Sequence, residues 1–336
     1  MKARASTPVI DTHAHWYPRD FIALLEREAA DNGAAMGRDA RGNPVFSLPT
    51  VSQKSTMVPE MIDPTLMVRN MKRRRIDVFA VSLTNPMVYW APPAFGLKLS
   101  RAWNDACAEL HTAYPDRFVG TMMLPMQAPE FALQELDRAA KLPGIRALYL
   151  AEAINGRNLH EKDFWPIYAR CEALKLPIFL HSLYPCGQER MGEFFLRNLL
   201  GNPYEAGIAA SCLVMGGVLD AFPSLKVMLP HAGGTFPWLI GRIDYGIKVR
   251  PDLAHMRRKP ASKYLRRFHY DTITHHPRIL GYLLDLVGAD RIVLGSDYNQ
   301  DMCDRRPVEF IEKLPGLTRR DRQMMLSDNA KKLLRL

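Results

Sequence analysis

Short apolar segments alternate with helical segments along almost the whole chain, and this alternation limits the possible folds more than any other feature. Most of the apolar segments are β-branched-rich or uniformly apolar, which is typical of strands buried on both faces of a parallel sheet. We expect eight such strands, at residues 8–11, 78–82, 118–123, 147–150, 178–181, 226–230, 268–271 and 291–295. Eight strands alternating with helices predict an α/β fold, a (β/α)8 TIM barrel.

The 336 residues suit one barrel with insertions, so we expect a single domain over residues 1–336. Residues 32–58 are rich in Gly, Pro, Ser and Thr and have no sustained period, which indicates a small insertion after strand one. A second long connection, residues 184–203, follows the fifth strand. Long loops at the carboxyl ends of barrel strands are where such enzymes build their sites.

Several classes of protein are disfavoured by the composition. No run approaches the roughly 18–20 apolar residues of a transmembrane helix, and residues 1–8 have no apolar signal segment. Five scattered cysteines form no CxxC pair, which favours the reducing cytoplasm over a disulfide framework. The net charge is +10, but no nucleic-acid-binding module accompanies the basic run 72–75, so we interpret that run as a solvated helix end.

Metal-binding side chains stand at several of the predicted strand ends. The first strand leads into His13 and His15, and alternate side chains of an extended chain face the same way, so both can reach one ion. His181 ends the fifth strand, His231 follows the sixth, and Asp297 follows the eighth. All strands of a barrel end at one pole, so we expect these residues to converge there.

Imidazoles with one carboxylate suit zinc, and they leave a coordination position for water. Zinc lowers the pKa of bound water to about 7, which gives a nucleophile or a proton source at neutral pH. An HxH pair alone could simply cap a loop, but that alternative does not explain further strand-end ligands in barrel order. The sequence therefore predicts one divalent metal ion, Zn²⁺ with Mn²⁺ as the alternative.

Nearly end to end, the chain resembles the amidohydrolase superfamily, and more narrowly the branch of 2-amino-3-carboxymuconate-6-semialdehyde decarboxylase. The ordered set of matching motifs is specific for this branch and much less specific for the substrate. The motifs are Ile10-Asp11-Thr12-His13-Ala14-His15, Trp103-Asn104-Asp105, Pro115-Asp116-Arg117-Phe118, His181 with Gly187-Gln188-Glu189-Arg190-Met191, His231-Ala232-Gly233-Gly234-Thr235-Phe236, Gly241-Arg242-Ile243-Asp244 and Leu294-Gly295-Ser296-Asp297-Tyr298.

The resemblance implies a role for each matched residue. It implies that His13, His15, His181 and Asp297 bind one metal ion. His231 would be the general base that takes a proton from metal-bound water, or orients that water. Arg242 would reach the site of a neighbouring subunit and hold a substrate carboxylate through a bidentate contact, which implies a homodimer or higher homo-oligomer. An ordinary salt bridge of Arg242, for example with Asp244, is the alternative.

The chain departs from the family pattern at positions that touch substrate. The sequence His181-Ser182-Leu183-Tyr184 replaces the family's His-Pro-Trp-Asp, and Tyr298-Asn299-Gln300 replaces Tyr-Pro-Phe. Lys54 stands near the position of a family arginine. It would act as a point charge, whereas an arginine can bind a carboxylate through two parallel hydrogen bonds. The further candidates for substrate binding are Arg190, Trp16 and Tyr184. We therefore expect the metal chemistry to be retained and the substrate to differ.

The leading hypothesis is a carboxy-lyase: metal-dependent, non-oxidative decarboxylation of an aromatic or unsaturated, muconate-like carboxylic acid. His231 would mediate proton transfer to the ring or alkene carbon, and CO2 would leave. Hydrolysis of a C–C, lactone or amide bond, or hydration of an alkene, would use the same metal ligands and remains the alternative. A small anionic organic substrate is the expected partner, with no nucleic acid and no membrane.

Overall fold

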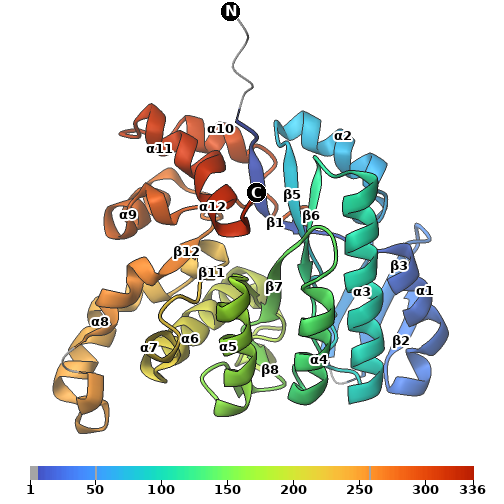
Figure 1. The fold of residues 1–336 in the computed structure, drawn as a ribbon, viewed down its shortest axis with the longest axis horizontal. Coiled ribbons are helices and arrows are strands. Elements are labelled where there is room, and N and C mark those ends of the chain that lie inside the picture. Colours follow the sequence, from blue (N-terminus) through green and yellow to red (C-terminus); the bar gives the residue numbers. More distant parts are fainter. Residues whose placement is uncertain (1–6, 50, 257–258) are drawn as a thin grey trace, which may run out of the picture.

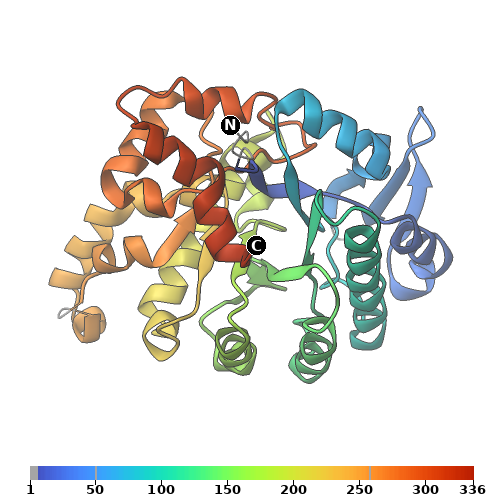
Figure 2. The ribbon, with the colours of Figure 1, turned by 45° about the horizontal axis from the view of Figure 1, so that its top comes forward.

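Seven parallel strands form one curved sheet in the computed structural model, which describes residues 7–49, 51–256 and 259–336. Figures 1 and 2 show the sheet curling around a central axis, with helices outside it. Neighbouring strands follow the chain order: β1 (Ile10–His15), β5 (Val78–Ser82), β6 (Phe118–Met122), β7 (Ile145–Ala151), β10 (Ile178–His181), β11 (Val227–Leu229) and β12 (Phe268–Tyr270). All seven overlap the predicted segments, with bounds that differ by up to four residues, and the predicted α/β barrel is confirmed.

The eighth predicted strand, residues 291–295, closes the barrel without forming a regular ladder. Val293 N donates to Tyr270 O of β12 at 2.9 Å, and Thr12 N of β1 donates to Leu294 O at 2.9 Å. Leu294 N, however, donates to Met325 O of a C-terminal helical turn at 3.0 Å, so this N–H does not pair with a neighbouring strand. One isolated bridge joins Ile292 of this segment to Tyr270 of β12, and a second joins Tyr298, beyond the segment, to Ala14 of β1.

Helices cover the outside of the sheet, and their bounds follow from local sequence signals. Proline stands at the start of α2, α3, α4 and α9, where its missing N–H costs no helical hydrogen bond. The helices are α1 (Arg19–Glu28), α2 (Pro64–Arg74), α3 (Pro93–Ala113), α4 (Pro129–Ala139), α5 (Trp165–Leu174), α6 (Asn202–Met215), α7 (Val218–Ala221), α8 (Phe236–Val249), α9 (Pro277–Val287), α10 (Pro307–Glu312), α11 (Arg319–Gln323) and α12 (Asn329–Leu334).

A separate antiparallel sheet lies between α1 and α2 in the chain. It comprises β2 (Ala35–Arg38), β3 (Pro44–Leu48) and β4 (Val51–Thr56), and Figure 2 shows it at the side of the barrel. The buried ring of Phe46 packs 4.9 Å from that of Trp90 and attaches the small sheet to the main body. A two-stranded ribbon of β8 (Ala153–Ile154) and β9 (Arg157–Asn158) follows β7.

The basic run 72–75 lies at the C-terminal end of α2, as expected from the sequence. Arg75 adopts the left-handed conformation that ends the helix, and its guanidinium donates two hydrogen bonds to Glu312, at 2.7 and 2.6 Å. Arg74 lies over the ring of Tyr298, with its Cζ 4.8 Å from the centroid. Among the residues described, no helix combines the length and the apolar character that crossing a bilayer requires.

Candidate metal centre

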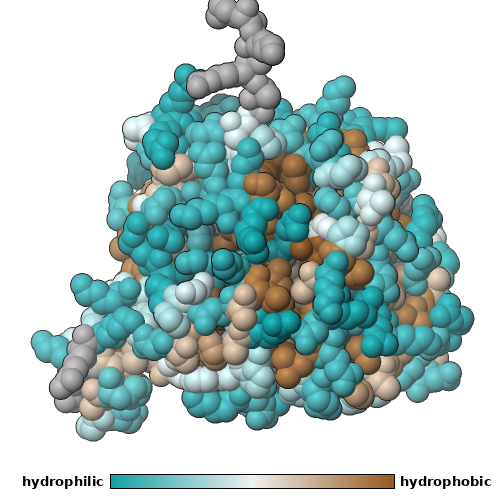
Figure 3. Space-filling view, in the orientation of Figure 1, coloured by the Kyte–Doolittle hydropathy of each residue, from teal (hydrophilic) through white to brown (hydrophobic). Residues whose placement is uncertain are grey.

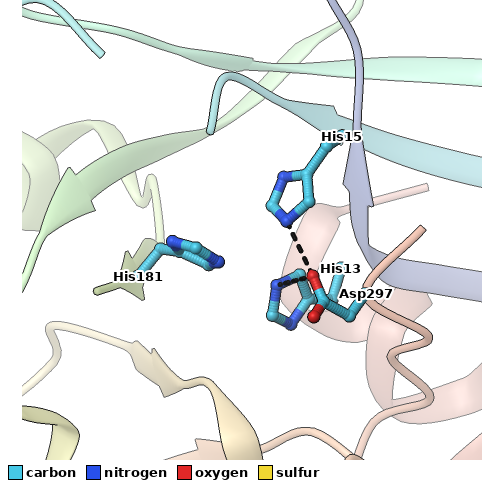
Figure 4. A group of neighbouring side chains, drawn as sticks. All are labelled: His13, His15, His181 and Asp297. Atoms are coloured by element: carbon cyan, nitrogen blue, oxygen red, sulfur yellow. Dashed lines mark hydrogen bonds and ion pairs between the residues drawn. The ribbon is translucent and has the colours of Figure 1, made fainter. Parts of the chain in front are cut away.

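Four buried side chains from distant parts of the chain meet at the carboxyl ends of the strands. His13, His15, His181 and Asp297 each offer one ligand atom, and these atoms all lie within 4.8 Å of one another. Figure 4 shows His181 approaching from the side opposite His13, His15 and Asp297. Three nitrogen donors and one oxygen donor therefore surround a common point, as predicted from the sequence.

The local backbone explains why these side chains converge. His13 and His15 stand two residues apart on β1 and share one face of that strand. His181 is the last residue of β10. Asp297 follows the eighth segment and has a φ of 56°, a left-handed conformation that aspartate tolerates better than most residues. In this conformation Asp297 Oδ1 lies 3.0 Å from His15 Nε2 and 3.5 Å from His13 Nε2.

A fully buried carboxylate, Asp271, holds both His13 and the turn that carries His231. Its Oδ2 lies 2.8 Å from His13 Nδ1 and accepts a hydrogen bond from the His231 backbone N–H at 2.9 Å. Its Oδ1 accepts from the N–H groups of Ala232 at 2.8 Å and Ile273 at 3.1 Å. A carboxylate accepting from Nδ1–H leaves His13 Nε2 unprotonated and facing the other ligands, which is the tautomer that metal binding requires.

Two further contacts support the ligands from behind. His15 Nδ1 lies 3.1 Å from Ser82 Oγ, which itself donates to Ala14 O. Asp11 is fully buried and accepts from the backbone N–H and hydroxyl of Ser296, at 3.1 and 2.5 Å, which ties β1 to the segment preceding Asp297. The ligand positions are thus fixed by hydrogen bonds before any ion binds.

Burial and mutual repulsion favour neutral imidazoles at His15 and His181, whereas contacts with histidines favour the ionised carboxylate of Asp297. Burial lowers the pKa of His181 well below its ordinary value, and the neighbouring His15 lowers it further. Burial likewise lowers the pKa of His15. Burial alone would raise the pKa of Asp297, but its hydrogen bond with His15 and the charge of His13 bring it below its ordinary value. His13 is the exception: burial opposes its protonation, yet the bond to Asp271 raises its pKa.

The donor set fits a divalent cation. His13 Nε2 is buried without a hydrogen-bond partner among the described residues, although such a nitrogen normally has one. It points at the oxygen of Asp297 from 3.5 Å, too far for a good hydrogen bond but compatible with two ligands of one ion. Three imidazoles and one carboxylate match the ligand types of zinc and related metals.

The predicted general base, His231, lies beside the four ligands. Its ring centroid is 5.6 Å from that of His13 and 5.7 Å from that of His181, and its Nδ1 has no hydrogen-bond partner in the described part of the chain. Its φ is 52°, a conformation stabilised by the hydrogen bond from its N–H to Asp271. Burial, and then the charge of His13, lower the pKa of His231, so the imidazole is neutral and able to accept a proton near pH 7.

The structure places the predicted substrate residues in different surroundings. Lys54 lines a cavity of about 200 Å3 with Tyr17, Asn299 and Gln300, residues close in sequence to the metal ligands. Trp16 is buried, and its indole N–H donates to Ile62 O at 3.2 Å. Arg190 and Arg242 are exposed, and neither forms an ion pair among the residues described.

Tyr184 lies in the loop after β10, next to a cation that no sequence pattern singled out. Arg197 donates to Leu183 O at 2.5 Å and to Gln188 Oε1 at 3.2 Å, and its Cζ lies 5.7 Å from the Tyr184 ring centroid. Burial lowers the pKa of this guanidinium, which has no carboxylate partner in the described residues. Burial also raises the pKa of Tyr184 to about 12, so its hydroxyl stays protonated at neutral pH.

The end of β7 contributes two buried polar residues that the sequence motifs also missed. Tyr149 has its ring 5.8 Å from that of His181, and its hydroxyl has no hydrogen-bond partner in the described structure. Glu152 directly follows β7, and neither of its buried oxygens has a partner there. Burial, followed by the charge of Glu205, raises the pKa of Glu152 well above its ordinary value. Only its position after the fourth barrel strand could have signalled it.

The sequence matches the amidohydrolase family over residues 10–336. The chain belongs to this family. It is 33% identical over 276 residues to the 2-amino-3-carboxymuconate-6-semialdehyde decarboxylase of Dictyostelium discoideum, an alignment that covers 82% of this chain and 77% of the relative. The resemblance seen in the motifs is therefore confirmed, and it places the chain in the decarboxylase-related branch.

Two solved structures share the fold over nearly the whole chain. The IDCase of Metarhizium anisopliae, in its apo form, superimposes with a TM-score of 0.84 and 23% identity, covering 98% of this chain and 97% of the other. The dihydroxybenzoic acid decarboxylase of Polaromonas sp. JS666, solved with manganese and the inhibitor 2-nitroresorcinol, gives a TM-score of 0.80, 23% identity and the same coverages.

Proposed function

We propose that this protein is a metal-dependent, non-oxidative decarboxylase of an aromatic or unsaturated carboxylic acid. The observation that carries the proposal is that His231, a neutral imidazole whose Nδ1 has no partner among the described residues, lies beside the cluster of His13, His15, His181 and Asp297. Decarboxylation with protonation at carbon requires a group that can accept and donate a proton next to a site for a divalent metal. The similarity to a decarboxylase of the same branch supports this choice of reaction.

A divalent ion in the cluster would supply Lewis-acid stabilisation of negative charge on the substrate. His231 accepts a proton and delivers it to the carbon that bears the carboxylate. Protonation interrupts the conjugation at that carbon, the bond to the carboxylate carbon breaks, and its electron pair restores the conjugated system as CO2 leaves. Asp271 keeps His231 in place through the backbone, and no oxidant or reductant is needed.

For the metal we propose Zn²⁺, because three imidazoles and one carboxylate are ligands that zinc favours. Manganese uses the same donor types and prefers a larger share of oxygen ligands, so it is the competing assignment. The manganese in the Polaromonas decarboxylase structure supports including it in the test. Reconstitution of metal-free protein with each ion, followed by measurement of turnover per bound ion, separates the two.

We propose that the substrate carboxylate is bound by Lys54 and by Arg242 from a neighbouring subunit of a homodimer. Lys54 lines the cavity of about 200 Å3 described above. Arg242 lies on α8, is exposed and has no ion pair in the described chain, which argues against the alternative of a salt bridge with Asp244. Exposed apolar side chains on the same helix support a subunit contact there: Trp238, Leu239, Tyr245 and Val249.

Release of CO2 distinguishes decarboxylation from hydrolysis or hydration, which the same cluster could also perform. Hydroxybenzoate-type and muconate-type acids are incubated with the metal-loaded protein in H2(18O), and CO2 and labelled product are both measured. The proposal predicts stoichiometric CO2, loss of one carboxyl group, and no 18O at carbon in the product. A product that keeps every carboxyl group and gains 18O would show a hydrolase or a hydratase instead.

A further inference from the structure

A large cavity lies at the opposite pole of the barrel from the metal ligands. Its volume is about 800 Å3, within the range of sites that take small organic ligands. It opens where strands begin: Leu176 precedes β10, Lys226 precedes β11 and Arg291 begins the eighth segment. Residues of α5 and α12 form other parts of its wall, and Figure 1 shows α12 beside the C-terminus, with α5 below it in the same view.

Positive charge dominates this cavity. The lining contains twice as many cations as carboxylates: the cations are Lys175, Lys226, Arg291, Arg320, Lys332 and Arg335, and the carboxylates are Glu172, Asp290 and Asp328. Among the described residues, Arg291 pairs with Asp290 at 3.3 Å, whereas the other five cations form no ion pair. Figure 3, in the orientation of Figure 1, shows hydrophilic surface interrupted by apolar patches on this face of the molecule.

Two carboxylates of the cavity are engaged by other partners. Glu172 accepts hydrogen bonds from the backbone N–H groups of Ser224 and Leu225, at 2.5 and 3.1 Å. Asp290 accepts two from Arg266, at 3.1 and 3.0 Å. Cations still outnumber carboxylates two to one in the lining, so the cavity keeps a positive potential.

A buried histidine, His269, lines the cavity and has a ring nitrogen without a hydrogen-bond partner among the described residues. His269, on β12, is only 8% exposed, lines the cavity, and its Nδ1 has no hydrogen-bond partner in the described chain. Burial lowers the pKa of His269 to about 4, and the charges of Arg291 and Lys226 add to the effect. Burial and three nearby cations likewise lower the pKa of Lys226. The cations around Lys226 repel one another, and an anion bound among them would relieve that repulsion.

We propose that the cavity binds a multivalent organic phosphate. The five cations that form no ion pair among the described residues can balance the charge of two phosphate groups, and the mixture of ammonium and guanidinium groups suits phosphate oxygens. His269 adds one hydrogen bond from the floor of the cavity. The volume accommodates a bisphosphorylated sugar or a molecule of similar size. The site is separate from the decarboxylase chemistry, because the metal ligands stand at the other end of the same strands.

The test is isothermal titration of the metal-loaded protein with glucose 1,6-bisphosphate, inorganic phosphate and citrate. We expect the bisphosphate to bind about tenfold more tightly than inorganic phosphate or more, and to weaken steeply with added NaCl. The double substitution Lys226→Glu and Lys332→Glu reverses two charges of the wall and should weaken binding at least about tenfold. Metal content and turnover should stay unchanged in this variant, which distinguishes the cavity from phosphate bound at the metal.

Lys141→Glu provides the matched control. Lys141 is an exposed lysine shortly after α4, it does not line the cavity, and its substitution should leave the binding of bisphosphate unchanged. Equal loss of binding in the control would show only a general effect of net charge and overturn the proposal. Undiminished bisphosphate binding by the double variant, or no detectable binding by the unmodified protein, would also overturn it. Tighter binding of citrate than of the bisphosphate would refute the assignment to phosphates.

Discussion

Replacement of Asp271 by asparagine is expected to weaken metal binding, although Asp271 is not one of the four metal ligands. The carboxylate accepts from His13 Nδ1 and the His231 N–H with one oxygen, and from the Ala232 and Ile273 N–H groups with the other. An amide has only one accepting oxygen, so its NH2 group must face one of these two pairs of donors. If the oxygen stays with Ala232 and Ile273, the NH2 group faces His13, whose imidazole must then carry its proton on Nε2, the atom that faces the metal.

The size of the effect follows from these contacts. Loss of a carboxylate that orients a metal-binding histidine costs about 10–100-fold in metal affinity, or about 1.4–2.7 kcal/mol. The His231 N–H loses its buried acceptor as well, which costs a further ~1–3 kcal/mol of folding stability. Asp271→Asn should therefore bind metal more weakly and unfold at a lower denaturant concentration, while the length and shape of the side chain are preserved.

A competition titration against a chromophoric chelator measures the first effect, and urea unfolding of the metal-free protein measures the second. Asp244→Asn is the matched control, because Asp244 accepts one backbone hydrogen bond within the described part of the chain, from Ser262 at 3.1 Å, and an amide oxygen can also accept it. The control should keep the affinity of the unmodified protein. Metal affinity of Asp271→Asn within about twofold of the unmodified protein would refute the tautomer argument.

Three further outcomes are expected. His231→Ala should keep its metal and lose about 10²–10⁴-fold in kcat, and near-normal turnover with full metal content would remove His231 from the mechanism. Inactive Arg242→Ala subunits mixed with inactive His231→Ala subunits should regain activity if Arg242 acts in the partner's site, and no recovery on mixing would confine it to its own subunit. The folded pKa of His269 is about 4, below its ordinary value of 6.5, so the unfolded chain takes up a proton first and up to ~3 kcal/mol of stability is lost as the pH falls from 6.5 to 4. Urea midpoints across this range should fall less for His269→Gln, and equal slopes would show that His269 does not titrate this way.

Much of the barrel and its metal site could be predicted because both depend on local patterns. Buried parallel strands are short apolar runs, and a barrel brings all their carboxyl ends to one pole, so His13, His181 and Asp297 could be placed together from strand order alone.

The remaining features depend on tertiary partners that no local pattern reveals. Asp271 looks like any residue at a strand end, and its role appears only when His13 and the turn at His231 are packed against it. The eighth segment has the composition of a strand, but Met325 competes for its backbone hydrogen bond. The basic cavity is assembled from segments that lie far apart in the chain, so its cations look like isolated surface charges in the sequence.

Anomalous diffraction at the absorption edge of the bound metal, from crystals of the active protein, would locate the ion itself. One peak is predicted, about 2.0–2.2 Å from one nitrogen each of His13, His15 and His181 and from an oxygen of Asp297. A peak elsewhere, or fully active protein with no peak among these four residues, would contradict the proposed metal centre and the reaction built on it.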